Sequence, residues 1–233
     1  MRINRKLKIG LLIIGATIPA FIVALGHLAS LKQDQTYYDD LEEALENADH
    51  AEVLVMRNRN LKILPPEIGQ LHNLKILNLG NNELTSLPRE IGTLQHLEEL
   101  SVENNQLDHL PIELLNLTRL RRVNFCNNQL DRFPAISNSL EEIYLSNNAI
   151  TEIPVWIRSL SRLAVLDLAE NRIDTISNNV ILPVTVRKID LYHNGLRSIG
   201  RPLFLLPSLK ELILEENDLD EETLTLHQKF KMK

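Results

Sequence analysis

The chain has 233 residues with 31 acidic and 25 basic side chains, so its formal net charge at pH 7 is −6. An acidic protein repels phosphate backbones, and 4% aromatic residues are too few to form base-stacking rows, so nucleic-acid binding is not expected. The single cysteine, Cys126, excludes an intrachain disulfide.

Residues 1–31 differ chemically from the rest of the chain. Residues 1–8 carry four basic side chains and no acidic one, and residues 9–31 contain no formally charged side chain. A basic segment before an apolar one is typical of an export signal, and this apolar run is also long enough to span a bilayer. We expect a cleaved signal peptide or an uncleaved signal anchor. A buried soluble helix is the alternative. Because positive charge stays in the cytoplasm, an inserted segment would place the remaining residues outside the cytoplasmic membrane.

Residues 32–50 are expected to form a linker followed by an N-terminal cap helix. Asp39 or Asp40 can start this helix, and Glu42 and Glu43 fall in its first turn. Apolar residues between positions 41 and 48 lie at helical spacing, which suits a helix that covers the open end of a stack. An amphipathic helix that binds a partner is the alternative.

Residues 51–222 contain eight copies of the pattern L-x-x-L-x-L-x-x-N-x-L-x-x-L-P, the cleanest being LKILNLGNNELTSLP at residues 74–88. The copies begin at Ala51, Leu74, Leu97, Leu120, Leu140, Leu163, Val186 and Leu209. Their spacing is 23 residues, apart from one step of 20 residues between the fourth and fifth copies. Such a repeat predicts an α/β solenoid, in which the x-L-x-L-x segments are short strands that stack into a parallel concave sheet.

One asparagine recurs at the same position of each repeat after the first, where Arg59 replaces it. An amide buried inside a turn can satisfy backbone donors and acceptors that no water reaches. We therefore expect a structural asparagine ladder without a catalytic role. The ladder consists of Asn82, Asn105, Asn128, Asn148, Asn171, Asn194 and Asn217.

The longer unit LPPEIGQLHNLKILNLGNNELTSLPREIGTLQHLEEL resembles the 23-residue Ras-group type of leucine-rich repeat. That type occurs in intracellular animal and plant scaffolds and in many bacterial repeat proteins, and the resemblance covers about residues 51 to 220. It implies short helical turns on the convex side, such as one held by Ile68 and Leu71. The Leu120 repeat lacks about one such turn, and Ile136 is expected to fill the space.

The outward-facing strand positions of the middle repeats are the candidate partner-binding surface. Tyrosine and arginine often anchor interfaces, and both types occur here among other polar residues. The alternative interpretation is an exposed charge ladder that contributes little stability. Cys126 is expected to be accessible at the centre of this face. The candidate residues are Arg122, Asn124, Glu142, Tyr144, Asp167, Lys188 and Tyr192.

No catalytic motif is present: the sequence contains no G-x-S-x-G, phosphate loop, H-E-x-x-H or C-x-x-C. We therefore expect a monomeric, non-enzymatic interaction module without cofactor or metal, displayed outside a membrane and bound to a protein partner through its concave face. Since the cysteine-rich caps of secreted vertebrate relatives are missing, a bacterial cell envelope is the expected location. The alternative is an intracellular, cytoplasmic signalling scaffold. A repeat-bearing enzyme of the bacterial effector type would need a separate catalytic domain. Residues 223–233 are expected to be a C-terminal tail in which Leu224 and Leu226 cover the edge of the last repeat and the basic end is solvated.

Overall fold

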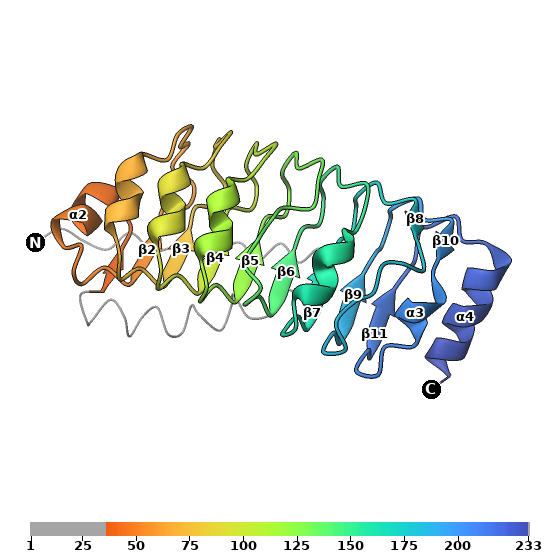
Figure 1. Ribbon diagram of the computed structural model, residues 1–233. Coiled ribbons are helices and arrows are strands. Elements are labelled where there is room, and N and C mark those ends of the chain that lie inside the picture. Colours follow the sequence, from red (N-terminus) through yellow and green to blue (C-terminus); the bar gives the residue numbers. More distant parts are fainter. Residues whose placement is uncertain (1–35, 233) are drawn as a thin grey trace, which may run out of the picture.

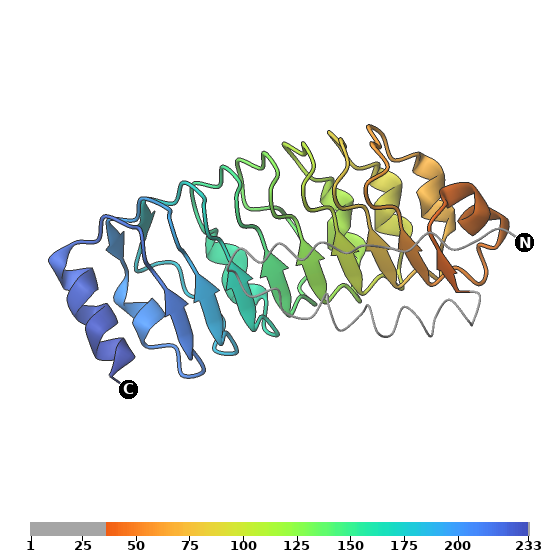
Figure 2. The ribbon, with the colours of Figure 1, turned by 180° about the vertical axis from the view of Figure 1, so that it is seen from behind.

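The computed structural model describes residues 36–232, so the predicted signal or anchor segment at residues 1–31 lies outside the described residues. Nine short strands form one parallel sheet on one side of an elongated stack, and helical turns cover the other side (Figures 1 and 2). We call the sheet side the concave face and the helical side the convex side. In spatial order the strands are β1 (Tyr37–Tyr38), β2 (Val53–Val55), β3 (Ile76–Asn78), β4 (Glu99–Ser101), β5 (Arg122–Asn124), β6 (Glu142–Tyr144), β7 (Val165–Asp167), β9 (Lys188–Asp190) and β11 (Glu211–Ile213).

The strand alternation expected from the repeat pattern is present in every rung. Leu77 and Leu79 of the second repeat are fully buried, and the residue between them lies on the concave face. Equivalent residues pair across neighbouring strands, as Leu77 does with Leu100. The 20-residue step preserves this register, because Arg122 still pairs with Glu142. The residues that this shorter repeat lacks therefore fall outside the sheet.

Short 3-10 helices form the convex layer of four repeats: η1 (Pro66–Gln70), η2 (Arg89–Thr93), η3 (Ile112–Asn116) and η4 (Val155–Ser159). Glycine allows the first three to pack closely. A Cβ atom on Gly92 would lie 2.6 Å from Glu113 Cβ and 2.7 Å from the Glu113 carbonyl oxygen. A larger residue there would force the neighbouring helices apart.

The convex layer is interrupted between η3 and η4, where the 20-residue repeat has no helix (Figure 1). Leu115 occupies the η3 position that corresponds to Gly92 in η2, and it is 45% exposed because no helix packs against it. Ile136 is only 1% exposed and fills the interior below, as expected. Trp156 of η4 closes the other side and packs edge-on against Phe133, with ring centroids 5.5 Å apart. The break leaves an apolar notch of about 290 Å³ on the convex side.

The two ends of the described chain carry helices. Near the N-terminal end, α2 (Leu41–Glu46) begins at Asp40, whose Oδ1 accepts the backbone N–H groups of Glu42 and Glu43 at 2.9 and 3.1 Å. Ala44 of this helix is fully buried. β1, which the repeat pattern does not predict, pairs with β2. No helix within residues 36–232 has the length and apolar character needed to span a bilayer.

The C-terminal tail expected at residues 223–233 is largely helical, and of the two leucines expected to cover the last repeat, Leu226 packs against the core and Leu224 is 44% exposed. Residues there belong to α4 (Glu221–Lys231), which begins at Asp220 and buries Thr223 and His227. The same end contains α3 (Arg201–Phe204) and a second, two-stranded sheet of β8 (Thr175–Ile176) and β10 (Ser198–Ile199). The inner face of α4 consists of Thr223, Leu226, His227 and Phe230, and this helical spacing was the available signal in the sequence.

Candidate functional site

The seven predicted ladder asparagines all lie inside the turns that follow the strands. Asn171 is typical: its Nδ2 donates to the carbonyl oxygens of Leu145 and Leu168 at 2.9 and 3.1 Å, and its Oδ1 accepts the Ile150 N–H at 3.0 Å. Each of the other six likewise donates to carbonyl oxygens of its own and the preceding turn and accepts a backbone N–H of the preceding turn. These side chains hold the stack together, so they are not available to a ligand.

A second, exposed row of asparagines was not expected from the sequence. Asn81, Asn104, Asn127 and Asn147 precede ladder residues and adopt left-handed backbone conformations with φ of 54° to 57°. Their side chains also bond along the stack, as Asn104 Nδ2 does to Asn81 Oδ1 at 2.6 Å. The repeated N-N pair in the sequence was the available signal, because asparagine tolerates the left-handed region better than most residues.

The N-terminal part of the concave face is covered by charges that compensate each other. Arg57 lies 2.6 Å from Glu103, and Arg122 forms an ion pair with Glu99. Gly80 provides the floor for the first pair, since a Cβ there would lie 2.8 Å from an Arg57 guanidinium nitrogen. These pairs leave little unbalanced charge on strands β2 to β5 for a partner to recognise.

The predicted candidates Arg122, Asn124, Glu142 and Tyr144 lie together on β5 and β6, as the register requires. Tyr144 does not match its expected role as an exposed anchor, because its side chain is only 8% exposed. Its hydroxyl donates to Glu142 Oε2 at 2.9 Å, and burial together with this carboxylate raises the pKa of Tyr144. Neighbouring side chains therefore cover the ring and limit its direct contact with a partner.

The remaining candidates lie on β7 and β9, and in the residues that follow β9. Asp167 is directly opposite Asp190 in the sheet register. Burial, followed by the charge of Asp190, raises the pKa of Asp167 to about 6, although a hydrogen bond from the Ala169 N–H and the positive charge of Lys188 oppose this shift. Burial also raises the pKa of Asp190. The sequence analysis did not select Asp190, although it occupies the same strand position as Asp167.

Two further candidates flank this aspartate pair. Lys188 Nζ donates to Glu211 Oε1 at 2.9 Å. Tyr192 is 38% exposed, its ring lies 5.9 Å from the His193 ring, and its backbone N–H donates to Asp190 Oδ1 at 3.0 Å. The accessible aromatic group of this face is thus Tyr192, at the end of the candidate surface.

Cys126 is less accessible than expected. The Ser146 hydroxyl donates to its Sγ at 3.0 Å, and the side chain is half-buried. Burial raises the pKa of the Cys126 thiol to about 12, so the reactive thiolate is scarce at neutral pH. A nucleophilic role does not fit this environment.

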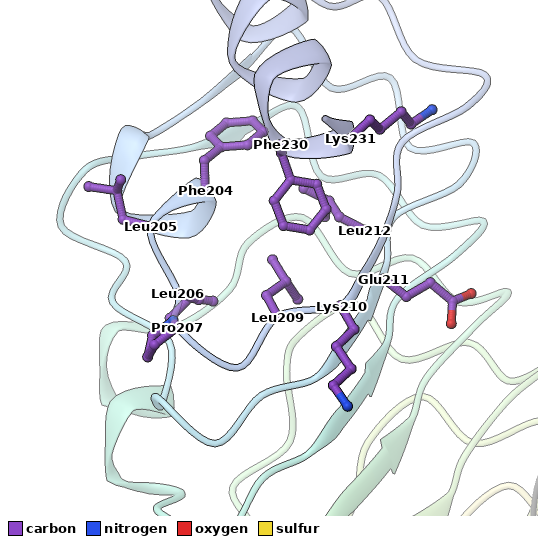
Figure 3. Close-up of a pocket in the computed structure, with 10 residues that line it drawn as sticks. All are labelled: Phe204, Leu205, Leu206, Pro207, Leu209, Lys210, Glu211, Leu212, Phe230 and Lys231. Carbon is purple, nitrogen blue, oxygen red and sulfur yellow. The ribbon is translucent and has the colours of Figure 1, made fainter. Parts of the chain in front are cut away.

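Hollows also occur at both ends of the stack. A cavity of about 690 Å³ lies between the loop after α3 and the end of α4, with Phe204, Leu209 and Phe230 pointing into it (Figure 3). Another of about 630 Å³ lies between α2 and the first repeat. Neither brings a nucleophile next to a base, and within residues 36–232 no cluster of histidine, cysteine, aspartate and glutamate could hold a metal.

Comparison with known proteins agrees with this architecture. The family described as "Leucine-rich repeat region" matches residues 19–143, and the family described as "Leucine Rich repeats (2 copies)" matches residues 138–180. No curated protein matches the chain.

Several solved structures share the fold. A leucine-rich-repeat protein of Leptospira interrogans is 29% identical, with a TM-score of 0.58 over 77% of this chain and 58% of its own. The leucine-rich effector YopM of Yersinia pestis is 28% identical, with a TM-score of 0.56 over 71% of this chain and 49% of its own. A plant peptide hormone receptor, solved in complex with RGF2, is 23% identical, with a TM-score of 0.60 over 78% and 35%.

The chain thus spans less than two thirds of the length of each of these proteins. Proteins with this architecture generally act as protein-interaction modules and not as enzymes. The family match covers more than half of the sequence, and the nine-stranded parallel sheet has the geometry that the repeats require. The chain belongs to the leucine-rich-repeat family.

Proposed function

We propose that the protein is a non-enzymatic interaction module that binds a protein partner through the concave face from β5 to Tyr192. The observation that carries this proposal is the close pair of carboxylates Asp167 and Asp190. Two carboxylates on adjacent rungs, both partly removed from water, repel each other, and the charge of Asp190 adds to the raised pKa of Asp167. A lysine or arginine side chain from a partner would relieve this repulsion.

The environment of the aspartate pair supports a protein partner. Tyr192 is an exposed aromatic side chain next to Asp190, and such residues supply much of the energy at interfaces. Ala169, a small residue, lies between Ser146 and Tyr192 at the same position of successive repeats. The rigid stack fixes these groups in advance, which reduces the ordering cost of binding. The partner segment would therefore present a basic side chain beside an apolar or aromatic one.

We further propose that residues 1–31 hold the repeats outside a membrane, in a bacterial cell envelope, either as an uncleaved anchor or as a cleaved export signal. The support is the basic segment followed by 23 residues without formal charge. The alternative is a cytoplasmic scaffold of the Ras-group type, supported by the 23-residue repeat with its LPPEIGQL unit. Cell fractionation with N-terminal sequencing of the product distinguishes the two.

Site-specific photo-crosslinking in cells tests the binding face and needs no purified partner. A benzophenone amino acid at position 192 should yield covalent adducts in the cells that produce the protein. The same amino acid at exposed Arg172, in the loop after the strand, should not. Adducts at position 192 should weaken when Asp190→Asn removes the charge. If adducts form equally at both positions, or survive Asp190→Asn unchanged, the proposed face is wrong.

A further inference from the structure

The convex side is chemically divided at the break between η3 and η4. In the first three repeats the segments that return from one strand to the next carry acidic residues, including Glu67, Glu90, Glu98 and Glu113. The last three return segments, after the break, contain no aspartate or glutamate. These segments are residues 155–164, 177–187 and 199–210, whereas the shortened fourth segment is followed directly by Glu141, which lies 3.9 Å from Arg121.

The acid-free segments carry exposed cations that lack ion-pair partners. Four side chains there, and Arg119 at the end of the third return segment, are exposed, and none of these five forms a salt bridge with any residue between 36 and 232, whereas Arg201 pairs with Glu222. This distribution contrasts with the protein as a whole, whose net charge is −6. The five cations are Arg119, Arg158, Arg162, Arg187 and Lys210.

Large apolar side chains are exposed on these segments and at Leu115 beside the break. Their exposed fractions are 45% to 71%, which is high for residues of this size, and the apolar notch between Leu115 and Trp156 adjoins them. They are Leu115, Val155, Ile181, Val184 and Leu205. We call these five residues and the five cations together the basic convex surface.

We propose that the basic convex surface docks on a bilayer that contains anionic lipids. Cations that form no ion pair within the fold are attracted to anionic headgroups, and aliphatic side chains that project between them can enter the interfacial region. An acidic body would be repelled by such a bilayer if its charge were spread evenly. Here the carboxylates lie on the concave face, on the loops, on the first three repeats and at Glu141, so the convex side beyond the break can approach the headgroups.

Docking through this side is compatible with partner binding. The convex segments and the sheet lie on opposite sides of the stack (Figures 1 and 2), so a docked molecule would present its concave face away from the bilayer. The inference does not depend on residues 1–31 being an anchor, because it rests on side chains of the repeats alone.

Trp156, the only tryptophan of the chain, provides a built-in reporter because it lies at the notch. The full chain would be assembled with nanodiscs that contain spin-labelled lipid near the headgroups. One set would consist of phosphatidylcholine and the other of phosphatidylcholine with one third phosphatidylglycerol. We expect quenching of Trp156 fluorescence in the anionic discs, little quenching in the neutral discs, and loss of quenching in high salt.

A charge-reversed variant and a matched control complete the experiment. Arg158→Glu, Arg162→Glu and Arg187→Glu together should abolish the quenching, since each cation near an anionic surface changes partitioning by roughly fivefold. Lys62→Glu, Arg172→Glu and Arg197→Glu make the same change in net charge on the loops after the strands, and this control should keep most of the quenching. Far-UV circular dichroism checks that both variants fold.

The outcomes separate this inference from the proposed anchor. Co-elution with neutral discs reports anchoring through the N-terminal segment, whereas Trp156 quenching reports the convex surface. Absence of quenching in anionic discs overturns the inference, whether or not the protein co-elutes, and would favour an acidic protein segment as the ligand of this surface. Equal quenching in neutral discs, or full quenching in the triple convex variant, also overturns it.

Discussion

Replacement of one ladder asparagine tests the physical basis of the stack. Asn171→Ala removes a side chain that is 7% exposed and that joins two successive turns. Its Nδ2 donates to the carbonyl oxygens of Leu145, Leu168 and Ala169 at 2.9, 3.1 and 3.0 Å, and its Oδ1 accepts the N–H of Ile150 at 3.0 Å. Alanine can make none of these bonds.

The expected loss in the free energy of unfolding is about 3 kcal/mol. A hydrogen bond contributes about 1 kcal/mol net, and a buried donor left without an acceptor costs about 1–3 kcal/mol. The Ile150 N–H is such a donor, since Ile150 itself is fully buried. The Ala169 carbonyl is only partly buried and can turn to water, which keeps the total below the sum of four full bonds.

Urea denaturation followed by circular dichroism and by Trp156 fluorescence measures this loss. Agreement of the two probes is needed because a repeat protein can unfold in parts. Asn116→Ala is the matched control: Asn116 is exposed at the end of η3, and we expect a change within about 0.5 kcal/mol there. If Asn171→Ala costs no more than Asn116→Ala, the structural role of the ladder is refuted.

Three other perturbations probe the packing and the electrostatics. Gly92→Ala should destabilise the protein by about 1–3 kcal/mol in the same urea assay, because its Cβ would clash with Glu113, whereas Leu115→Ala at the interrupted equivalent position should cost less. Asp167→Asn should become increasingly stabilising as pH rises from about 4 to 7. The pKa of Asp167 is about 6 when folded and about 4 when unfolded, so its ionisation weakens the fold over this range; a stability difference that stays constant with pH would contradict this. The Cys126 thiol should react with iodoacetamide at pH 8 at least ~100-fold more slowly in the folded chain than in urea, and equal rates would refute its burial.

The sheet could be predicted from the sequence because each repeat contains the same alternating pattern of apolar residues. Alternation around Leu77 and Leu79 fixes which side chains enter the core, and a 23-residue period fixes the register of neighbouring strands. The 20-residue step could also be interpreted, since the pattern resumes in phase at Leu140 and only the convex segment is shortened. These features depend on residues close together in the sequence.

The end structures could not be predicted in the same way, because they depend on packing against a neighbour. β1 is two residues long and is defined by its pairing with β2. α4 is a strongly polar helix. Its His227 is buried against the last strand of the sheet, where its Nε2 lies 3.3 Å from the Leu212 carbonyl oxygen. Neither segment carries the repeat pattern, so its structure follows from the surface that the last complete repeat leaves uncovered.

The placement of the candidate residues on the sheet could be predicted, but the exposure of their side chains could not. The outward strand positions place Arg122, Tyr144 and Asp167 on one face, but the alternation does not say which long side chains will cover their neighbours. Tyr144 is only 8% exposed, and its hydroxyl bonds to Glu142 on the same strand. Exposure at a concave surface is a collective property of several rungs.

The two sides of the stack differ in how much charge of one sign they can carry. Adjacent strands are about 4.8 Å apart, so like charges on neighbouring rungs repel by about 1 kcal/mol even in water and by more when half-buried. Arg122 and Glu99 therefore occur as an ion pair on the sheet, and the carboxylates of Asp167 and Asp190 are the exception. Side chains exposed on the convex return segments face high-dielectric solvent and are screened by salt, so cations such as Arg158 and Arg187 remain without an ion pair at little cost. An excess of like charge thus has a different meaning on each side. On the sheet it opposes folding and therefore indicates binding, whereas on the convex side it becomes informative only because acidic residues are missing from three successive segments.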